Sequence, residues 1–347
     1  MRVSARIAFL SITILMQVRA VAAQDVVVRQ SPSRLVVVAN GPERRIEAYR
    51  TTDLERIWRF DGPRHPRTVV FAPSGRGAVL DAVANSATIF SDRGARSLRV
   101  GETPVAALFV GETLFVACRD SRSLEKIDES GTRQVLPTAS DVSAAATSGR
   151  RIYLYSRVDG TVEEFGSSPF RSISKGRIAP FASDLVLDDK VGYLSLPQSG
   201  EVVVFSLETL KITQRVPVGA VPVDLELERP ADTLSARTLA VADPSSKRIW
   251  RTEGAQSDTA AFTRGFVRGL IGMGLYSPRS SSFPTGVDRI RSNGRETIAF
   301  DSSSATLYQV TKKGSRQIAR DIGSEAFDLT SSSVLVWQQR LISYPLR

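Results

Sequence analysis

Residues 35–49 read LVVVANGPERRIEAY, and their pattern is the strongest indication of the fold. An apolar, β-branched run ends in a polar turn at Asn40 and Gly41, and a second run follows in which apolar and polar residues alternate. This pattern predicts two antiparallel strands joined by a tight turn. A lone pair of strands is only marginally stable in water, so the fold depends on whether the unit is repeated.

The same unit recurs along most of the chain. Clear copies occupy residues 114–127, 153–165, 193–205, 239–250 and 298–310, and fainter copies begin at Ala78 and Val334. The eight copies carry the turn residues Asn40, Asn85, Asp120, Asp159, Gln198, Asp243, Asp301 and Gln338. Neighbouring turn residues are 35 to 45 residues apart, except for 58 residues between Asp243 and Asp301. A repeat of this length is typical of solenoids and propellers.

A second repeated feature lies between the copies. A glycine and then a proline introduce a further apolar strand in residues 62–75, 101–112 and 219–228. Proline suits the first position of a strand, because its missing N–H costs no hydrogen bond of the ladder there. Each unit therefore contains four short strands in about 40 residues, which is the size of one propeller blade.

We therefore predict an all-β fold, a β-propeller that forms one domain from residue 24 to residue 347. Counting inner strands from Val26 gives eight blades, and the last of them, residues 326–346, has sequence for three strands only. A ring needs its last blade joined to its first. Residues 26–28 would make that join if they paired with the last blade, and seven blades is the alternative to eight.

The repeat resembles the YVTN-type repeat of bacterial surface and periplasmic propellers. The resemblance rests on Val38-Ala39-Asn40 and on two Val-Gly-x-x-Pro segments, residues 100–104 and 218–222. It covers most of the chain in a degenerate form. It implies a propeller, seven-bladed in that family, and an exported location, and it implies no single activity.

The first 23 residues have the features of a signal peptide. Arg2 and Arg6 precede an apolar run, residues 7–16, that is too short to span a bilayer, and small residues follow at 20–23. We expect an exported protein, periplasmic or extracellular, with no transmembrane span after cleavage. Cleavage removes Arg2, Arg6 and Arg19, which lowers the formal net charge from +10 to +7.

The remaining positive charge is scattered arginine rather than a run of the kind that binds nucleic acid. It favours anionic neighbours such as lipid headgroups or acidic polymers, unless it reflects only the base composition of the genome. The single cysteine, Cys118, has no partner for an internal disulfide, and its apolar neighbours predict a buried, unreactive thiol.

The long interval after Asp243 predicts an insertion at about residues 254–290. Between Arg264 and Arg295 the sequence contains six arginines and one acidic residue, together with exposed-looking apolar residues. This combination suits an anionic surface or a partner protein. The candidate binding residues are Arg264, Phe266, Arg268, Tyr276 and Arg279. The alternative is an outer strand of the sixth blade followed by a surface loop.

The repeated turns supply a second candidate site, because equivalent turns share one face of the ring. The candidate binding residues there are Arg119, Asp120, Arg157, Asp159, Asp243, Lys247 and Asp301. Four of them are aspartates that would form a ring of carboxylates. The alternative is that Asp and Asn at these positions accept hydrogen bonds from the backbone of their own turns.

Composition limits the chemistry that these sites could perform. His65 is the only histidine, which argues against imidazole-rich metal sites and a Ser-His-Asp triad. We therefore expect a noncatalytic binding or scaffold propeller of the cell envelope, without a cofactor, whose partner is an envelope protein, a glycan or an anionic surface. The alternative is a lactonase-like, metal-dependent hydrolase that holds Ca²⁺ or another divalent cation with carboxylates at the channel mouth.

Overall fold

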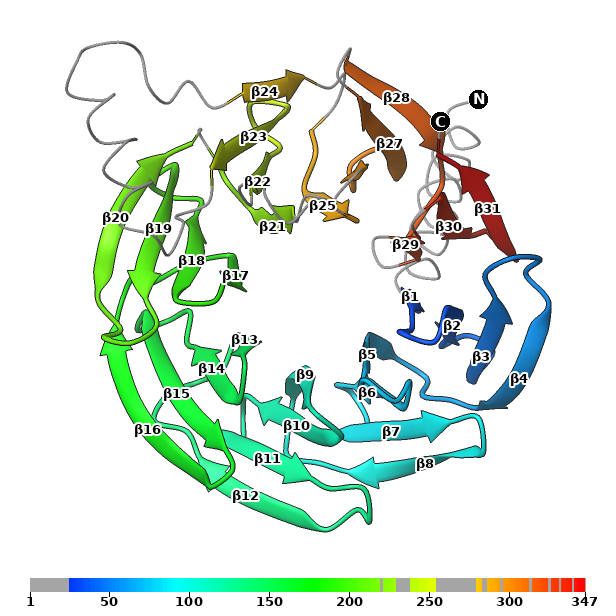
Figure 1. The fold of residues 1–347 in the computed structure, drawn as a ribbon, viewed down its shortest axis with the longest axis horizontal. Coiled ribbons are helices and arrows are strands. Elements are labelled where there is room, and N and C mark those ends of the chain that lie inside the picture. The colour runs from blue at the N-terminus through cyan, green and yellow to red at the C-terminus, as the bar shows by residue number, and fades with distance from the viewer. Residues whose placement is uncertain are drawn as a thin grey trace, which may run out of the picture.

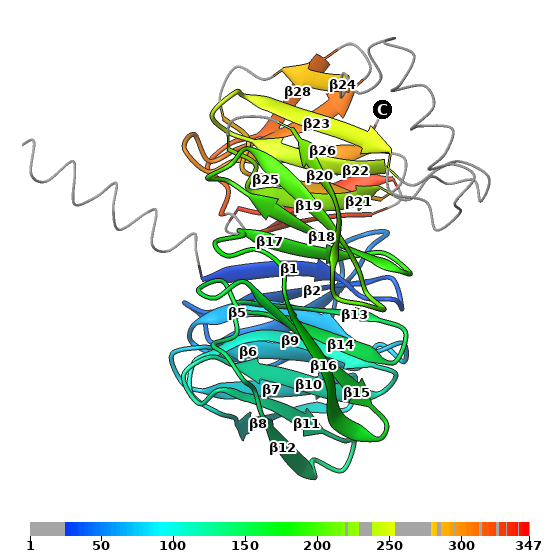
Figure 2. The same ribbon diagram turned by 90° about the vertical axis from the view of Figure 1, so that its left-hand side faces the viewer.

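The computed structural model describes residues 25–218, 221–228, 238–253, 279–282, 286–293, 296–311, 314–323, 326–330, 332–338 and 340–346. These residues form eight antiparallel sheets arranged in a ring, which is an eight-bladed β-propeller (Figure 1). Seen from the side, the inner strands run roughly along the ring axis and the outer strands are tilted away from it, so the turns fall on two opposite faces (Figure 2). The predicted fold class and the count of eight blades are confirmed.

Each blade runs from an inner strand at the ring axis to an outer strand at the rim, in chain order. The first two blades consist of β1 (Val26–Gln30), β2 (Leu35–Asn40), β3 (Arg45–Arg50), β4 (Arg56–Asp61), β5 (Pro66–Phe71), β6 (Gly77–Asp81), β7 (Ser86–Ser91) and β8 (Gly94–Arg99). The next two consist of β9 (Pro104–Val110), β10 (Thr113–Cys118), β11 (Ser123–Ile127), β12 (Arg133–Pro137), β13 (Ala144–Ser148), β14 (Arg151–Tyr155), β15 (Thr161–Ser167) and β16 (Phe170–Arg177).

The second half of the ring repeats this order. The fifth and sixth blades consist of β17 (Asp184–Leu187), β18 (Val191–Leu196), β19 (Glu201–Ser206), β20 (Ile212–Pro217), β21 (Asp224–Glu228), β22 (Thr238–Asp243), β23 (Arg248–Glu253) and β24 (Arg279–Ser282). The last two consist of β25 (Arg289–Ser292), β26 (Thr297–Asp301), β27 (Thr306–Thr311), β28 (Gly314–Ala319), β29 (Phe327–Leu329), β30 (Ser333–Trp337) and β31 (Leu341–Pro345). Among the described residues, no helix is long and apolar enough to cross a membrane.

The ring closes by side-chain packing rather than by strand exchange. The eighth blade has three strands, as predicted, and β1 pairs with β2 of its own blade from Val26↔Asn40 to Gln30↔Val36. The alternative in which residues 26–28 complete the last blade is therefore wrong. Instead, valines of β1 and β2 share one apolar cluster with Phe327 and the eighth blade. The backbone N–H of Gln30 also donates a hydrogen bond to Asp328 Oδ2 at 2.5 Å.

Apolar layers between neighbouring blades form the core. In β2, Val36 and Val38 pack toward the eighth blade, whereas Val37 and Ala39 pack toward the second blade. Both faces of the middle strands are thus buried, and such strands are apolar at every position instead of every second one. This explains the continuous apolar runs from which the repeat was recognised.

The turn between the second and third strands follows one backbone pattern around the ring. Its last residue has a left-handed φ in seven blades: Arg44 (52°), Asn85 (51°), Arg122 (45°), Gly160 (70°), Gly200 (69°), Lys247 (57°) and Ala305 (49°). We call the face that carries these turns the turn face. Because these seven turns hold equivalent positions in their blades, they share one face of the ring, as predicted.

Two blades also share a glycine–phenylalanine pair across the second and third strands. Gly77 lies opposite Phe90, and Gly192 lies opposite Phe205. A Cβ on Gly77 would lie 2.1 Å from Phe90 Cζ, so the ring occupies the space that any other residue would need. We expect Gly77→Ala to lower the free energy of unfolding by about 2 kcal/mol, as overpacking of a core does.

Urea unfolding of purified protein would measure this loss. Adding Phe90→Leu to Gly77→Ala should recover part of it, because the smaller side chain vacates the space above residue 77. A double variant no more stable than Gly77→Ala would contradict the explanation.

Candidate functional site

The four aspartates predicted to form a ring of carboxylates on the turn face do not occupy equivalent positions. Asp243 and Asp301 are the last residues of β22 and β26 and are buried, with 0% and 1% of their surface exposed. Asp120 and Asp159 lie inside their turns and are exposed. The turns therefore do not present four matching carboxylates to a ligand.

Asp243 and Asp301 stabilise the turns that follow them. Asp243 Oδ1 accepts hydrogen bonds from Ser246 N at 3.2 Å and from Val221 N, in the loop that enters the same blade, at 3.2 Å. Asp301 Oδ1 accepts a hydrogen bond from Ser303 N at 2.9 Å. This is the turn-stabilising role that the sequence offered as the alternative.

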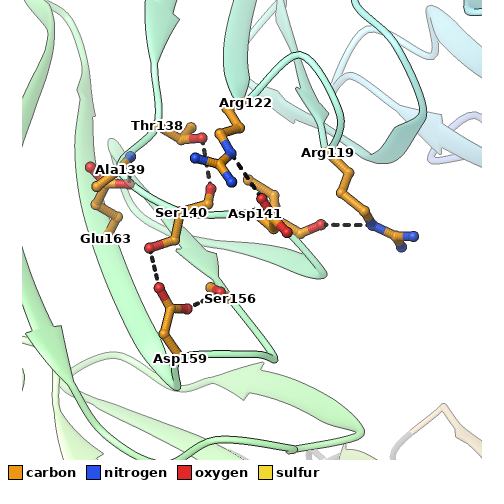
Figure 3. A network of polar contacts seen from close by, with 10 residues as sticks. Arg119, Arg122, Thr138, Ala139, Ser140, Asp141, Ser156, Asp159 and Glu163 are labelled. Atoms are coloured by element: carbon orange, nitrogen blue, oxygen red, sulfur yellow. Dashed lines mark hydrogen bonds and ion pairs between the residues drawn. The ribbon is translucent and has the colours of Figure 1, made fainter.

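Arg119 and Asp159 belong to a polar network that joins the third and fourth blades (Figure 3). Ser140, in the loop between β12 and β13, donates its hydroxyl hydrogen to Asp159 Oδ2 at 2.6 Å. Arg119 Nε donates to the carbonyl oxygen of Val142 in the same loop at 3.4 Å. Although desolvation opposes the shift, the hydrogen bonds from Ser140 and Ser156 hold the pKa of Asp159 below its usual value.

The remaining candidates on the turn face belong to the turns of three different blades. Thr103 donates its hydroxyl hydrogen to Asp120, which ties that turn to the loop entering its own blade. Arg157 and Lys247 have exposed side chains in turns of the fourth and sixth blades. The seven predicted residues thus come from the turns of four blades, the third, fourth, sixth and seventh.

The predicted insertion lies mostly outside the described residues. Arg264, Phe266, Arg268 and Tyr276 are among the residues that are not described. Arg279 is the first residue of β24, which pairs with β23 as the outer strand of the sixth blade. The segment 254–290 is therefore not wholly an insertion, because its end supplies this outer strand and the beginning of β25.

The structure also shows the surroundings of the single cysteine and the single histidine. Cys118 is buried between the second and third blades, and burial raises the pKa of its thiol to about 12, with the charge of Glu125 adding to the shift. The predicted burial of the thiol is thus confirmed, and its lack of reactivity stays a prediction. His65 is a half-exposed loop residue whose Nδ1 lies 3.6 Å from Asp25 Oδ1. Within the described ranges, no group of three or more His, Cys, Asp or Glu residues is placed to hold a metal ion.

A charged cluster that the sequence analysis missed lies at the ring axis. It consists of side chains on the inner strands of five blades: Arg29, Asp184, Asp224, Glu226, Arg289, Arg291 and Asp328. We call it the axis cluster. Arg29 of the first blade interacts electrostatically with Glu226 of the sixth, which shows that these side chains converge from distant blades. All seven are half-buried, so part of each still faces solvent.

Three carboxylates of the axis cluster each link their own blade to the next one. An inner strand pairs on one side only, so the N–H groups on its other edge need acceptors. Asp184 of the fifth blade accepts a hydrogen bond from Leu225 N of the sixth at 2.9 Å. Asp224 of the sixth accepts one from Ile290 N of the seventh at 2.8 Å. The bond from Gln30 to Asp328 repeats this contact between the eighth and first blades.

The crowding of charge at the axis changes the ionisation of these groups. Burial, reinforced by the charge of Asp224, raises the pKa of Asp184 to about 7. Burial also raises the pKa of Glu226 to about 7 and that of Asp224 above its ordinary value. Burial lowers the pKa of Arg29, and for Arg289 the nearby Arg291 lowers it further. Shifted carboxyl groups in a solvent-facing position are a common mark of a functional site.

Four carboxylates and three guanidinium groups give the axis cluster a charge that depends on pH. Burial raises the pKa values of Asp184, Asp224 and Glu226, so protonation of these carboxyl groups makes the charge of the cluster more positive as the pH falls.

The cluster left a signal in the sequence that could have been read. Two inner strands, DLELE at residues 224–228 and RIRS at residues 289–292, alternate charged or polar residues with apolar ones. The inner strand of the first blade, in contrast, begins with three valines at residues 26–28. Aligning the inner strands instead of the turns would have brought these charges to one axis. The hydrogen bonds between blades, in contrast, depend on register and had no signal in the sequence.

Comparison with known proteins supports the fold and no particular activity. No protein-family model matches the chain, and no curated protein matches it. The resemblance to the YVTN-type repeat therefore gains no support beyond the propeller fold itself.

Solved structures of propellers do match. The computationally designed Ika8 protein has a TM-score of 0.66 at 10% identity, with 93% of this chain and 97% of that chain covered. Sqt1 of Saccharomyces cerevisiae has 0.65 at 11% identity, with 93% and 97% covered. Hydrazine synthase of Kuenenia stuttgartiensis has 0.59 at 13% identity, with 86% and 96% covered. At such identities the likeness shows the fold alone, and fold does not determine function.

Proposed function

We propose that this chain is an exported, noncatalytic binding propeller of the cell envelope and that its axis cluster holds an acidic group of an envelope glycan. The observation that carries the proposal is the convergence of Arg29, Arg289 and Arg291 at one axis. Burial disfavours the charged form of Arg29 and Arg289, and a carboxylate of the ligand would stabilise it. Of the partners expected from the sequence, a carbohydrate chain with carboxylates matches this chemistry.

The proposal predicts pH-dependent binding. Protonation of Asp184 and Glu226 below pH 7 removes negative charge beside the arginines, so an anionic ligand should bind more tightly in acid. We expect tri-galacturonic acid to bind roughly ten times more tightly at pH 5.5 than at pH 8, which corresponds to ~1.4 kcal/mol. Isothermal titration calorimetry at the two pH values measures this ratio.

Matched variants locate the binding. Arg289→Gln should weaken binding at least about tenfold, as loss of a charge-assisted hydrogen bond does. Arg50→Gln is the control, because it removes the same charge from an exposed ion pair with Asp53 and Glu55 at the rim. Equal losses in the two variants, or equal affinity at the two pH values, would rule out the axis cluster as the site.

Export is tested separately. A reporter enzyme fused behind residues 1–30 should appear in the periplasm or medium of a bacterial host, and the fusion without residues 1–23 should stay inside. Retention of both fusions inside the cell would contradict an exported protein.

For the hydrolase alternative, the described residues offer no carboxylate group with the arrangement of a metal site. The alternative thus gains no support from the part of the ring that is described.

A further inference from the structure

The outermost strands of the blades differ in charge from the rest of the chain. Together these eight strands contain eleven arginine and lysine residues and one acidic residue, Asp61. The whole chain contains 46 basic and 36 acidic residues, so a general bias toward arginine would not produce this ratio. Positive charge is therefore concentrated at the rim of the ring.

The excess of positive charge is complete in three consecutive blades, whose outer strands are β8, β12 and β16 (Figure 1). These strands contain no acidic residue, and their six basic residues are Arg96, Arg99, Arg133, Arg171, Lys175 and Arg177. All six are exposed, and within the described ranges only Arg133 forms an ion pair, with Glu125 at 2.7 Å. We call the exposed surface of β8, β12 and β16 the rim patch.

Exposed aliphatic side chains lie among these cations. Val135 of β12 and Ile173 of β16 are 49% and 40% exposed. Ile173 is the extra residue of a β-bulge, because the register with β15 shifts between Glu164 and Phe165. A bulge re-aims a side chain and protects a sheet edge, but a polar residue would protect the edge equally well. An isoleucine at this position therefore indicates a contact with an apolar layer.

This combination fits an anionic lipid surface better than an anionic polymer. Lipid headgroups attract arginine and lysine, and the boundary between headgroups and acyl chains accepts aliphatic side chains. Polymers with bases or sugar rings are usually held by exposed aromatic rings that stack on them. Phe170 is the only aromatic residue of the three strands, and it is half-buried with its ring 5.7 Å from that of Phe115.

We propose that the rim patch docks the propeller edge-on on an anionic lipid surface. Arg99, Arg171 and Lys175 contact the lipid phosphate groups, and Val135 and Ile173 enter the boundary beneath them. The ring axis then lies parallel to the surface, so both of its ends stay open to solvent. This inference goes beyond the proposed function, because the surface and the ligand both differ from those of the axis cluster. It stands even if the axis cluster binds nothing.

Sedimentation with lipid vesicles tests the proposal on the chain without residues 1–23. Vesicles of equal parts phosphatidylglycerol and phosphatidylcholine should bind the protein, whereas vesicles of phosphatidylcholine alone should not. Each cation close to an anionic surface strengthens binding about fivefold. Arg99→Gln combined with Arg171→Gln should therefore weaken binding at least about tenfold. The melting temperature should not change, since neither arginine forms an ion pair within the described part of the chain.

Arg44→Gln combined with Arg150→Gln provides the matched control. This double variant removes the same charge from exposed side chains in turns on the two opposite faces of the ring, outside the rim patch. It should bind vesicles nearly as the wild type does, because salt screens charges that lie far from the contact. Equal weakening in the two double variants would mean that only net charge matters, and the rim patch would not be the docking surface.

A fluorescent label gives a second readout. Cys118, the only cysteine, is buried, so a polarity-sensitive label on Ile173→Cys reports on that position alone. Its emission should shift to shorter wavelength with phosphatidylglycerol vesicles, whereas a label on Val83→Cys, at a position that is 73% exposed on the turn face, should not respond. A shift at position 83 and none at position 173 would overturn edge-on docking.

The basic segment noted in the sequence and the axis cluster are tested beside the rim patch. Loss of vesicle binding in Arg264→Gln combined with Arg268→Gln, with full binding in the rim variant, would assign the lipid contact to that segment and contradict the proposal. Vesicle binding should be unchanged in Arg289→Gln, and the rim variant should keep its affinity for tri-galacturonic acid. If the rim variant lost both ligands equally, the patch would attract anions in general and the choice of lipid would be wrong.

Discussion

Replacing Phe327 with alanine should open the ring at its closure and lower the free energy of unfolding by about 3–5 kcal/mol, the usual cost of removing a buried phenylalanine. Phe327 is 1% exposed and packs 5.6 Å from the ring of Phe300 in the cluster that joins the seventh, eighth and first blades. No strand is exchanged across this junction, so side chains carry most of the connection. The lost packing cannot be replaced by ladder hydrogen bonds.

Hydrogen exchange distinguishes local opening from a general loss of stability. In Phe327→Ala, the amides of β1 and β29 should exchange faster than those of β14, on the far side of the ring, because local opening exposes only the closure. Phe165→Ala is the control, since Phe165 is equally buried but lies between the third and fourth blades. Phe165→Ala should lower the free energy of unfolding by a similar amount, but the amides of β1 should not exchange faster than those of the other strands. Uniform exchange in both variants would mean that closure is no weaker than any other junction.

The sequence predicted the repeated part of this fold, because the repeat is made of local patterns. An apolar run on both sides of a polar turn, such as residues 35–49, specifies a hairpin wherever it occurs, and its recurrence fixes the number of blades. The three-stranded last blade followed from the same count. How the ring closes did not follow, since both pairings of β1 satisfy the same pattern of apolar residues.

The candidate sites were predicted less well, and the reason is physical. Turn residues such as Asp120 and Asp243 appear equivalent when the copies are aligned by their polar turns, but they differ by two positions relative to the end of the strand. That difference decides whether the carboxylate is exposed or buried against its own turn. The axis cluster and the rim patch each combine residues from three or more blades, and such groupings arise from the closed ring rather than from any local pattern.

Glu226→Gln should remove a measurable part of the pH dependence of stability. The folded state raises the pKa of Glu226 from 4.5 to about 7, so the folded chain holds this proton more tightly than the unfolded chain does. The resulting stabilisation is complete below about pH 4 and is lost as the pH rises through 7. The difference between these two pKa values corresponds to about 3 kcal/mol, of which water at the axis screens a part.

In the wild-type protein, raising the pH from 5 to 8 should therefore lower the melting temperature by several degrees, since ~1 kcal/mol shifts a chain of this size by about 2–4 °C. Asp184, whose pKa is also raised to about 7, contributes in the same direction. Glutamine resembles the protonated carboxyl and can still accept the hydrogen bond from the N–H of Ser292, so Glu226→Gln should be more stable than wild type at pH 8 and nearly equal to it at pH 5.

Differential scanning calorimetry at the two pH values measures both differences. Glu208→Gln, which alters an exposed glutamate in the turn between β19 and β20, should melt as the wild type does at each pH. If the melting temperature of Glu226→Gln fell by as many degrees between pH 5 and pH 8 as that of the wild type, the proton responsible for the pH dependence would not reside on Glu226. The groups left to hold it would be Asp184 and Asp224, which face the same arginines, and Asp184→Asn would then remove the pH dependence that Glu226→Gln had left in place.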